Sequence, residues 1–271
     1  MSTERNVNKV TIPVLQQKKE SGEKISALTA YDFLMAEMID QAGIDLILVG
    51  DSAAMVVAGE SDTLKIGMEE MLYHTRIVAG AVQRAFVVGD MPFLSYQPSQ
   101  EQAIQNAGKF LKAGAEAVKI EGGAVVAPLV KTLTSYGIPV LGHIGLTPQS
   151  VHQLGGYKTR GTSEREANIL MNDALQLQDA GAFAVVLEKI PESLAQKITN
   201  SLSIPTIGIG AGKYCDGQIL VSHDMLGIYD KFKPRFVRRY AELGKLMREA
   251  FAAYQKDVSE GHFPSDKESF K

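Results

Sequence analysis

Seven short apolar runs, each followed by a longer stretch, are the feature that most constrains the fold of this chain. Each run is almost continuously aliphatic or β-branched, which is typical of a strand buried on both faces. The runs lie at 24–30, 46–50, 86–91, 117–122, 139–145, 184–189 and 205–212. The stretches between them show the spacing of apolar residues that predicts helices. Alternation of this kind predicts an α/β protein with a parallel sheet.

The number and spacing of the units favour a closed barrel. A chain of 271 residues with seven strand-then-helix units fits a (β/α)8 (TIM) barrel better than the alternative, a doubly wound open sheet. We expect the eighth strand within 236–240, before a final amphipathic helix that runs through Tyr254. No linker or low-complexity segment interrupts the chain. We therefore expect a single domain over 1–271, with a short N-terminal extension and a polar C-terminal tail from about residue 259.

Glycines stand where several predicted helices end. Gly43, Gly114, Gly137 and Gly181 each precede one of the apolar runs by a few residues. A helix commonly ends with a residue in the left-handed conformation, which glycine adopts without a steric penalty. The positions of these glycines therefore predict helix C-termini.

Charge and composition narrow the class of partner. The formal net charge of -3 gives no electrostatic reason to expect a nucleic acid or an anionic membrane as partner. The N-terminal segment lacks the apolar stretch of a signal peptide, and no apolar run is long enough to cross a bilayer. The one cysteine, Cys215, excludes an intrachain disulfide, which suits a reducing cytoplasm, and we expect it to be a small side chain in a loop. We expect a soluble protein.

Polar side chains stand where the predicted strands end. Asp51, Asp90, Glu121, His143 and Glu188 lie at or just after the ends of five different apolar runs. In a (β/α)8 barrel the carboxyl ends of all strands face one mouth, where catalytic groups gather. We therefore expect these five side chains to converge on one cavity.

A lysine and several carboxylates in one cavity predict a cation site. Lys119 lies two residues before Glu121, so both side chains face the same side of their strand. A buried lysine needs an anionic partner, either a protein carboxylate or a substrate. Carboxylates gathered at the mouth repel one another unless a cation compensates, and ligands that are all oxygen favour Mg²⁺. Zinc would more often recruit His or Cys, and no second histidine occupies an equivalent strand end.

Structural explanations compete with each assignment. A strand-end aspartate can simply cap the next helix or turn. Lys119 can form an ion pair inside the barrel, and His143 can hydrogen-bond to a neighbouring strand. Glu188 can pair with the adjacent Lys189. The residues alone leave these alternatives open.

Two further features are interpreted as structural. His74 lies among apolar residues of a predicted helix and is expected to pack there or to lie on the surface. The glycines of GIGAG, 208–212, could cradle a phosphate with their amides. We favour the simpler interpretation that these glycines allow a tight turn.

Several motifs, taken together and in order, carry a resemblance to a known family. They are LTAYD, LVGDS, YHT, VKIEGG, GHIGLTPQS, GGYK, LE, IPTIGIGAG, DGQILVSHDMLGI and the terminal FP…SF. In this combination the chain resembles the ketopantoate (3-methyl-2-oxobutanoate) hydroxymethyltransferases, within the phosphoenolpyruvate mutase and isocitrate lyase group of barrels. The resemblance runs from about residue 10 to the C-terminus.

The resemblance implies an enzyme of pantothenate biosynthesis, and hence of coenzyme A biosynthesis. It implies transfer of a hydroxymethyl group from 5,10-methylenetetrahydrofolate to 3-methyl-2-oxobutanoate, giving 2-dehydropantoate. Mg²⁺ is the implied cofactor and the folate is the one-carbon co-substrate. The implied location is the cytoplasm, and the implied assembly is a homodecamer of two stacked pentameric rings.

The resemblance also implies roles for the strand-end residues. The implied metal ligands are Asp51, Asp90 and Glu121. The implied substrate-binding residues are Asp51, Ser52, Asp90 and Lys119. Glu188 is the implied proton acceptor, and His143, in a secondary role, would orient the substrate or a water molecule.

The residue pattern suits this implied chemistry. A keto acid that chelates Mg²⁺ through its 2-oxo and carboxylate oxygens would lose its C3 proton to give a Mg²⁺-stabilised enolate. We expect the long loops after 46–50 and 139–145 to act as lids that exclude water and admit the pterin. Two alternatives stay open. One is a Mg²⁺-dependent carbon–carbon lyase or phosphomutase of the same barrel group, which would not need folate. The other is a non-catalytic barrel that binds a phosphate ligand at 208–212.

Overall fold

The computed structural model describes residues 8–229 and 234–270. The chain forms two compact units, which divide between Val221 and Ser222. The first unit contains all the residues of the predicted site. The expectation of one domain over 1–271 stays a prediction.

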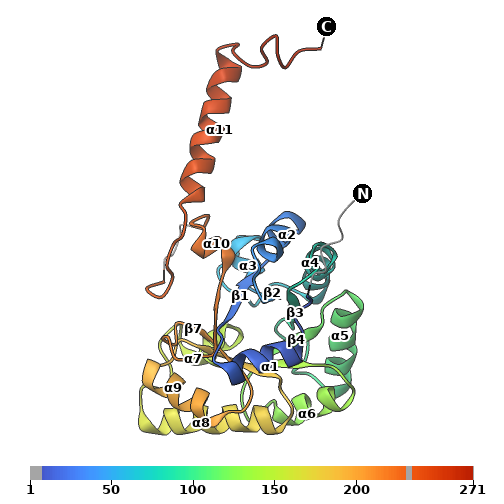
Figure 1. Cartoon of the computed structure of the whole chain (residues 1–271), viewed down its shortest axis with the longest axis vertical. Coiled ribbons are helices and arrows are strands. Elements are labelled where there is room, and N and C mark those ends of the chain that lie inside the picture. The colour runs from blue at the N-terminus through green and yellow to red at the C-terminus, as the bar shows by residue number, and fades with distance from the viewer. Residues whose placement is uncertain (1–7, 230–233, 271) are drawn as a thin grey trace. The chain divides into compact units, whose positions relative to one another are not determined.

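The first unit is a closed barrel of eight parallel strands in which each strand pairs with the next and β8 pairs with β1 (Figure 1). The strands are β1 (Ile25–Thr29), β2 (Leu46–Val49), β3 (Phe86–Asp90), β4 (Ala117–Glu121), β5 (Val140–Gly145), β6 (Ala184–Glu188), β7 (Thr206–Ile209) and β8 (Gly217–Leu220). The prediction of an α/β protein with a (β/α)8 barrel is confirmed.

The predicted position of the eighth strand is wrong. β8 is Gly217–Leu220, which pairs with β1 and β7, whereas residues 236–240 form a turn and irregular chain. β8 is hard to find in the sequence because it is not continuously apolar: it begins with a glycine, and Gln218 is exposed. It also follows β7 after a short connection without a helix between them, so the strand-then-helix alternation that reveals the other strands is missing.

Helices cover the outside of the barrel wall. They are α2 (Phe33–Gln41), α4 (Met68–Ala81), α5 (Gln100–Lys112), α6 (Ala127–Ser135), α8 (Glu164–Asp179) and α9 (Glu192–Ser201). α1 (Ile12–Ser21) instead packs through Leu15 with side chains of the barrel interior, and α3 (Ala53–Val56) and α7 (Val151–Leu154) are single turns in the loops after β2 and β5. The side chains of Asp32, Ser99 and Ser163 cap α2, α5 and α8 by accepting a backbone N–H three residues on.

The four glycines predicted to end helices do so. Gly43, Gly114, Gly137 and Gly181 have φ values of 82°, 102°, 78° and 95°, directly after α2, α5, α6 and α8. These are left-handed conformations that favour glycine over residues with a Cβ. Each glycine lets the chain leave its helix and enter the next strand.

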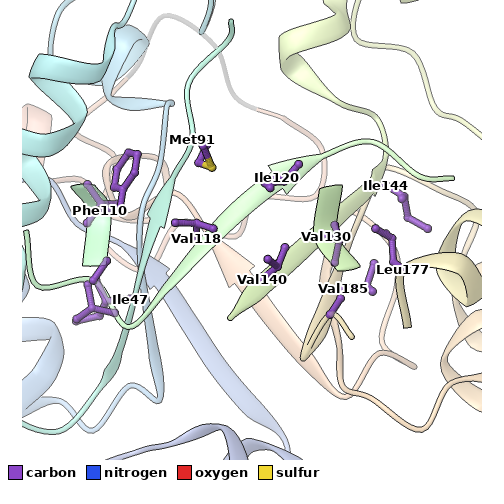
Figure 2. Packing of buried hydrophobic residues seen from close by; sticks show 14 of the residues in the cluster. Ile47, Met91, Phe110, Val118, Ile120, Val130, Val140, Ile144, Leu177 and Val185 are labelled. Atoms are coloured by element: carbon purple, nitrogen blue, oxygen red, sulfur yellow. The ribbon is translucent and has the colours of Figure 1, made fainter. Parts of the chain in front are cut away.

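The alternation of side chains along the strands separates two buried layers. Ile47, Val118, Val140 and Val185 point away from the barrel axis and pack with helix residues such as Phe110, Val130 and Leu177 (Figure 2). Residues of the opposite parity fill the barrel interior, among them Leu46, Leu48, Phe86, Val88, Leu141 and Val186. In β4, Val118 and Ile120 belong to the outer layer, so Lys119 and Glu121 face the inside of the barrel.

The second unit, described over 222–229 and 234–270, contains α10 (Ser222–Met225) and α11 (Leu243–Ser259). Backbone hydrogen bonds from Leu243 to Leu226 and from Gly244 to Gly227 hold the two helices together. The predicted final helix is confirmed, and it runs five residues beyond Tyr254. None of the helices described is both long enough and apolar enough to span a bilayer.

Candidate active site

The strand ends place the predicted side chains at one end of the barrel. Asp90, Glu121 and Glu188 are the last residues of β3, β4 and β6, and Asp51 follows β2 by two residues. The register sets Asp90 beside Lys119. It also sets Glu121 beside His143 on β5. Neighbouring strands thus bring these residues together, as the barrel geometry predicts. We call Asp51, Asp90, Lys119, Glu121 and His143 the mouth cluster.

Lys119 is the centre of the mouth cluster. Its Nζ lies 2.9 Å from Asp90 Oδ1 and 3.2 Å from Glu121 Oε1, and the residue is only 3% exposed. Burial lowers the pKa of the Lys119 ammonium, but the carboxylates around it outweigh burial and raise the pKa well above its usual range. Lys119 is therefore a fixed positive charge inside the barrel mouth.

Glu121 has partners on both carboxylate oxygens. Oε1 lies near Lys119 Nζ and 3.4 Å from His143 Nδ1, and Oε2 accepts the backbone N–H of Gln149 at 3.0 Å. Burial raises the pKa of Glu121, yet the Lys119 charge and the His143 hydrogen bond lower it overall to about 2. Glu121 is ionised and held in one orientation.

His143 connects the cluster to the predicted proton acceptor. Its Nε2 lies 3.2 Å from Glu188 Oε2, while its Nδ1 faces Glu121. Burial and the charge of Lys119, whose Nζ is 3.2 Å from Nδ1, lower the pKa of His143. The two nearby glutamates, Glu121 and Glu188, outweigh both effects and raise this pKa to about 9. The imidazole therefore joins Glu121 and Glu188 across the mouth.

Asp51 and Asp90 are two buried carboxylates held next to each other. The backbone N–H of Asp51 donates to Asp90 Oδ2 at 2.9 Å. Burial, followed by the charge of Asp90, raises the pKa of Asp51 well above its usual range. Burial also raises the pKa of Asp90, and the Lys119 charge offsets this only in part. These two groups are the ones in the cluster that an additional cation would stabilise most.

Two residues that the sequence analysis did not single out complete the polar network. Gln149, in the short 3-10 turn Pro148–Ser150 after β5, donates through Nε2 to Asp51 Oδ2 and to the Met91 carbonyl, both at 3.0 Å. Tyr96 donates its hydroxyl to Gln149 Oε1 at 2.9 Å. Both side chains are buried. Both come from loops, where no periodicity marks a residue as inward-facing.

Ser52 and His74 both contact Tyr31, Ser52 at its hydroxyl and His74 at its carbonyl oxygen. The Ser52 hydroxyl lies 2.8 Å from the Tyr31 hydroxyl, and His74 Nδ1 lies 2.7 Å from the Tyr31 carbonyl oxygen. The hydrogen bond to the main chain supports a structural role for His74. Ser52 is partly exposed beside Asp51, so it stays available to a ligand.

The loop after β5 is fastened at both ends to the last residues of β6. The Leu146 N–H donates to the Glu188 carbonyl at 2.8 Å, and the Arg160 N–H donates to the Lys189 carbonyl at 3.0 Å. The ammonium of Lys189 also bonds to the Tyr157 carbonyl. Lys189 has a positive φ of 50°, unusual for a residue with a side chain. Residues 146–160 thus form a loop whose two ends are both held beside Glu188.

The glycines of GIGAG support packing rather than an anion site. Gly210 and Gly212 have φ values of 63° and 80°. A Cβ on Gly212 would lie 2.4 Å from Glu192 Cγ, so only glycine fits against this side chain. Cys215 is buried, and a Cβ on Gly208 would lie 2.9 Å from its sulfur. These observations favour the tight-turn interpretation.

The donor set at the mouth fits a hard cation that shares its coordination with a ligand. Over 8–229 and 234–270, no three His, Cys, Asp or Glu side chains are arranged to hold a metal ion by themselves. Mg²⁺ commonly binds one or two protein carboxylates and takes its other ligands from substrate oxygens and water. Asp51 and Asp90, buried and with raised pKa values, meet that requirement.

The chain is similar to known proteins over nearly its whole length. The model of the family described as ketopantoate hydroxymethyltransferase matches residues 9–266. The chain is 54% identical to 3-methyl-2-oxobutanoate hydroxymethyltransferase from Clostridium beijerinckii, over 97% of this chain and 96% of that one. It is 52% identical to the protein of the same name from Syntrophus aciditrophicus, over the full length of both.

Solved structures with similar folds come from more distant proteins. A phosphonopyruvate hydrolase in complex with oxalate and Mg²⁺ superposes with a TM-score of 0.65 at 15% identity, covering 95% of this chain and 92% of that one. A 2,3-dimethylmalate lyase, a member of the PEP mutase/isocitrate lyase superfamily, gives a TM-score of 0.61 at 17% identity, covering 96% and 91%. At such identities the likeness shows a shared barrel fold.

Proposed function

Because the chain belongs to the ketopantoate hydroxymethyltransferase family, we propose that it transfers a hydroxymethyl group from 5,10-methylenetetrahydrofolate to 3-methyl-2-oxobutanoate. The product would be 2-dehydropantoate, on the route to pantothenate. The observation that carries the proposal is the buried Lys119 among carboxylates at the strand ends, with Glu188 linked to it through His143.

Asp51 and Asp90 would hold Mg²⁺, and the bound ion would supply positive charge next to the oxygens of the keto acid. Support comes from their burial and raised pKa values, and from the phosphonopyruvate hydrolase of the same fold that was solved with oxalate and Mg²⁺. Glu121 stays a proposed third ligand. Since both of its oxygens already have partners, we expect it to contribute mainly charge.

Lys119 would bind the keto acid through its carboxylate or keto oxygen. Its ammonium is fixed by Asp90 and Glu121, so it would meet the substrate without having to reorganise. Asp51, Ser52 and Asp90 would contact the same molecule. In this arrangement positive charge would lie where negative charge develops when C3 loses its proton.

Glu188 would accept the C3 proton. Its carboxylate is partly exposed, with 16% of the side chain accessible, while the side chains of the mouth cluster lie deeper. His143 Nε2, 3.2 Å from Glu188 Oε2, would hold the carboxylate in position. The proton would move from C3 to a carboxylate oxygen of Glu188. One water molecule would hydrolyse the two C–N bonds of the folate methylene, which gives tetrahydrofolate and formaldehyde. The carbanion would attack the formaldehyde carbon, and the former carbonyl oxygen would take up a proton as the new hydroxyl.

The loop 146–160 would act as a lid. It is attached to Glu188 and Lys189 at its ends, and Gly155 and Gly156 have positive φ values of 67° and 111° ahead of Tyr157. The part of the loop after Gln149, which is itself held in the mouth, can then close without displacing Glu188. Closing would exclude water from the carbanion and complete the folate site.

The proposal is tested by exchange of the C3 proton of 3-methyl-2-oxobutanoate in D₂O with Mg²⁺. We expect Glu188→Gln to slow exchange by about 10²–10⁴-fold, the usual contribution of a general base, with keto-acid affinity retained. Glu101→Gln, a matched change at an exposed position of α5, should leave exchange unchanged. If Glu188→Gln instead lost keto-acid binding while each occupied site exchanged the proton at the normal rate, Glu188 would not be the base.

Folate dependence separates this reaction from its nearest alternative. A Mg²⁺-dependent carbon–carbon lyase or phosphomutase would turn over its substrate without 5,10-methylenetetrahydrofolate. Product formation that requires the folate supports the hydroxymethyl transfer. Turnover of a 2-oxo acid without the folate would favour the alternative.

The cytoplasm is the proposed location and a homodecamer of two pentameric rings the proposed assembly, as the family resemblance implies. Sedimentation of the full chain tests the assembly. A mass ten times that of the chain supports the decamer, and a monomer or dimer would contradict it.

A further inference from the structure

Gln149 is a buried amide at the mouth to which the proposed reaction assigns no part. It is 5% exposed and follows β5 in a short turn beside the mouth cluster. A buried glutamine is costly unless its amide is hydrogen-bonded, so its partners show what it does in the fold.

Every polar group of the Gln149 side chain has a partner. Nε2 donates to Asp51 Oδ2 and to the Met91 carbonyl, both at 3.0 Å, which uses both hydrogens of the amide nitrogen. Oε1 accepts the Tyr96 hydroxyl at 2.9 Å. The backbone N–H of the same residue donates to Glu121 Oε2 at 3.0 Å.

The acceptors around Gln149 fix which way its amide points. Asp51 Oδ2 and the Met91 carbonyl are both acceptors, so Nε2 must face them and Oε1 faces Tyr96. The one hydrogen of the Tyr96 hydroxyl has two acceptors, Gln149 Oε1 at 2.9 Å and the Glu121 carbonyl at 3.2 Å. If the amide were reversed, its oxygen would face a carboxylate and a carbonyl, which are both acceptors. The Tyr96 hydroxyl also receives the Glu121 backbone N–H at 3.3 Å, so it is anchored to β4.

These bonds join the ends of three strands. Asp51 follows β2, Met91 follows β3 and Glu121 ends β4, and one residue bonds to all three. Two of its partners are carboxylates that the proposed function uses. In metal sites, groups that hold the ligands in orientation typically change metal affinity 10–100-fold when they are removed.

We propose that Gln149 is a positioning residue whose side-chain amide orients the Asp51 carboxylate for Mg²⁺ and keto-acid binding, while its backbone N–H holds Glu121. The inference rests on the proposed function. It assigns the short turn after β5 a direct part in the site, in addition to its place in the lid loop.

The test is Gln149→Met, which keeps the length of the side chain, removes the side-chain bonds to Asp51, Met91 and Tyr96, and leaves the backbone N–H bond to Glu121 in place. Mg²⁺ is titrated by calorimetry into the wild-type protein and the variant, with 3-methyl-2-oxobutanoate present. We expect Mg²⁺ to bind the variant about 10–100-fold more weakly, with an unchanged circular dichroism spectrum. Gln153→Met, a matched change at an exposed position of the same loop, should bind Mg²⁺ like the wild type.

Tyr96→Phe is the second variant, in case Gln149→Met does not fold. It keeps Gln149 and removes only the hydroxyl that faces its amide oxygen. We expect Mg²⁺ binding to weaken by more than twofold and by up to about tenfold, since the amide keeps its bonds to Asp51 and Met91 but loses its partner at Oε1.

The outcomes separate the two proposals. Mg²⁺ affinity within twofold of the wild type in a folded Gln149→Met protein, or in Tyr96→Phe if Gln149→Met does not fold, would overturn the role of Gln149. A wild-type protein that binds no Mg²⁺ with the keto acid would instead overturn the metal site of the proposed function.

Discussion

Two aspartates stand six residues apart, at opposite ends of β2, in opposite electrostatic surroundings. Asp45, just before the strand, has a pKa below its usual range: burial raises it, but hydrogen bonds from Ser26, Arg84 and Lys18 outweigh burial. Asp51, just after the strand, has a pKa well above its usual range. The ionised form of an aspartate is thus stabilised at one end of the barrel and destabilised at the other.

The two ends of the barrel differ in how many positive groups surround each carboxylate. At the base, Asp45 lies 3.1 Å from Lys18 Nζ and 3.0 Å from an Arg84 nitrogen, so one carboxylate faces two cations. At the mouth, three carboxylates share Lys119 and His143. The base is arranged for stability, and the mouth retains negative charge that a bound cation can neutralise.

The largest effect should come from neutralising the aspartate at the mouth. We expect Asp51→Asn to lower kcat/KM by about 10³-fold, because metal stabilisation of developing charge supplies several kcal/mol. The free energy of unfolding without metal should rise, since burial and the charge of Asp90 raise the pKa of the Asp51 carboxyl and disfavour its ionised form in the folded protein. Steady-state assays and urea unfolding in a chelator measure the two quantities. If Asp51→Asn were less stable than the wild type but fully active, the proposed difference between the two ends of the barrel would be wrong.

The reverse pattern is expected at the base. Asp45→Asn should lower the free energy of unfolding by about 2 kcal/mol, because charged hydrogen-bond partners are lost from a buried site. kcat/KM of the folded variant should stay within about twofold of the wild type, since Asp45 lies at the other end of the strand. Urea unfolding and the same steady-state assay measure these quantities. A large loss of kcat/KM would show that the two ends are coupled.

The lowered pKa of Asp45 also predicts a pH dependence. Its folded pKa lies below the unfolded value near 4, so its contribution to stability is complete above about pH 4 and is lost as the pH falls through the folded value. The groups that face it are Lys18, Arg84 and Ser26, of which Lys18 also pairs with Glu23. We expect the stability difference between wild type and Asp45→Asn to be constant from pH 7 to 5 and to shrink below pH 4. A difference that grows on acidification would contradict the assignment.

The smallest effect on stability is expected at an exposed ion pair. Lys245 and Glu249 form an exposed pair 3.7 Å apart, one turn apart on α11. Glu249→Gln should change the unfolding free energy by only about 0.3–0.5 kcal/mol. This change should be smaller at high salt, because salt screens exposed charges. Urea unfolding at two salt concentrations measures this. An effect as large as that of Asp45→Asn would mean that burial does not explain the difference between ion pairs in this protein.

The sequence was sufficient to predict the barrel and the meeting of five side chains from five strands. Continuous apolar runs mark the strands, and strand ends such as Asp90 and Glu121 must gather at one mouth once the sheet closes. Gln149 and Tyr96 were not predicted because they come from irregular loops, where burial follows no period. β8 was misplaced because its exposed Gln218 and initial glycine break the pattern. The roles of the strand-end residues stay predictions.

The attachment of loop 146–160 to Glu188 and Lys189 has a consequence for how such an enzyme can diversify. Its two main-chain anchors depend on no particular side chain, so the segment between Val151 and Thr159 can be exchanged for another without moving either anchor. A new second substrate could be accommodated by replacing this segment while Glu188, the proposed proton acceptor, stays where it is. Chimeras that swap only these nine positions would keep the keto-acid half of the catalyst and vary the other half.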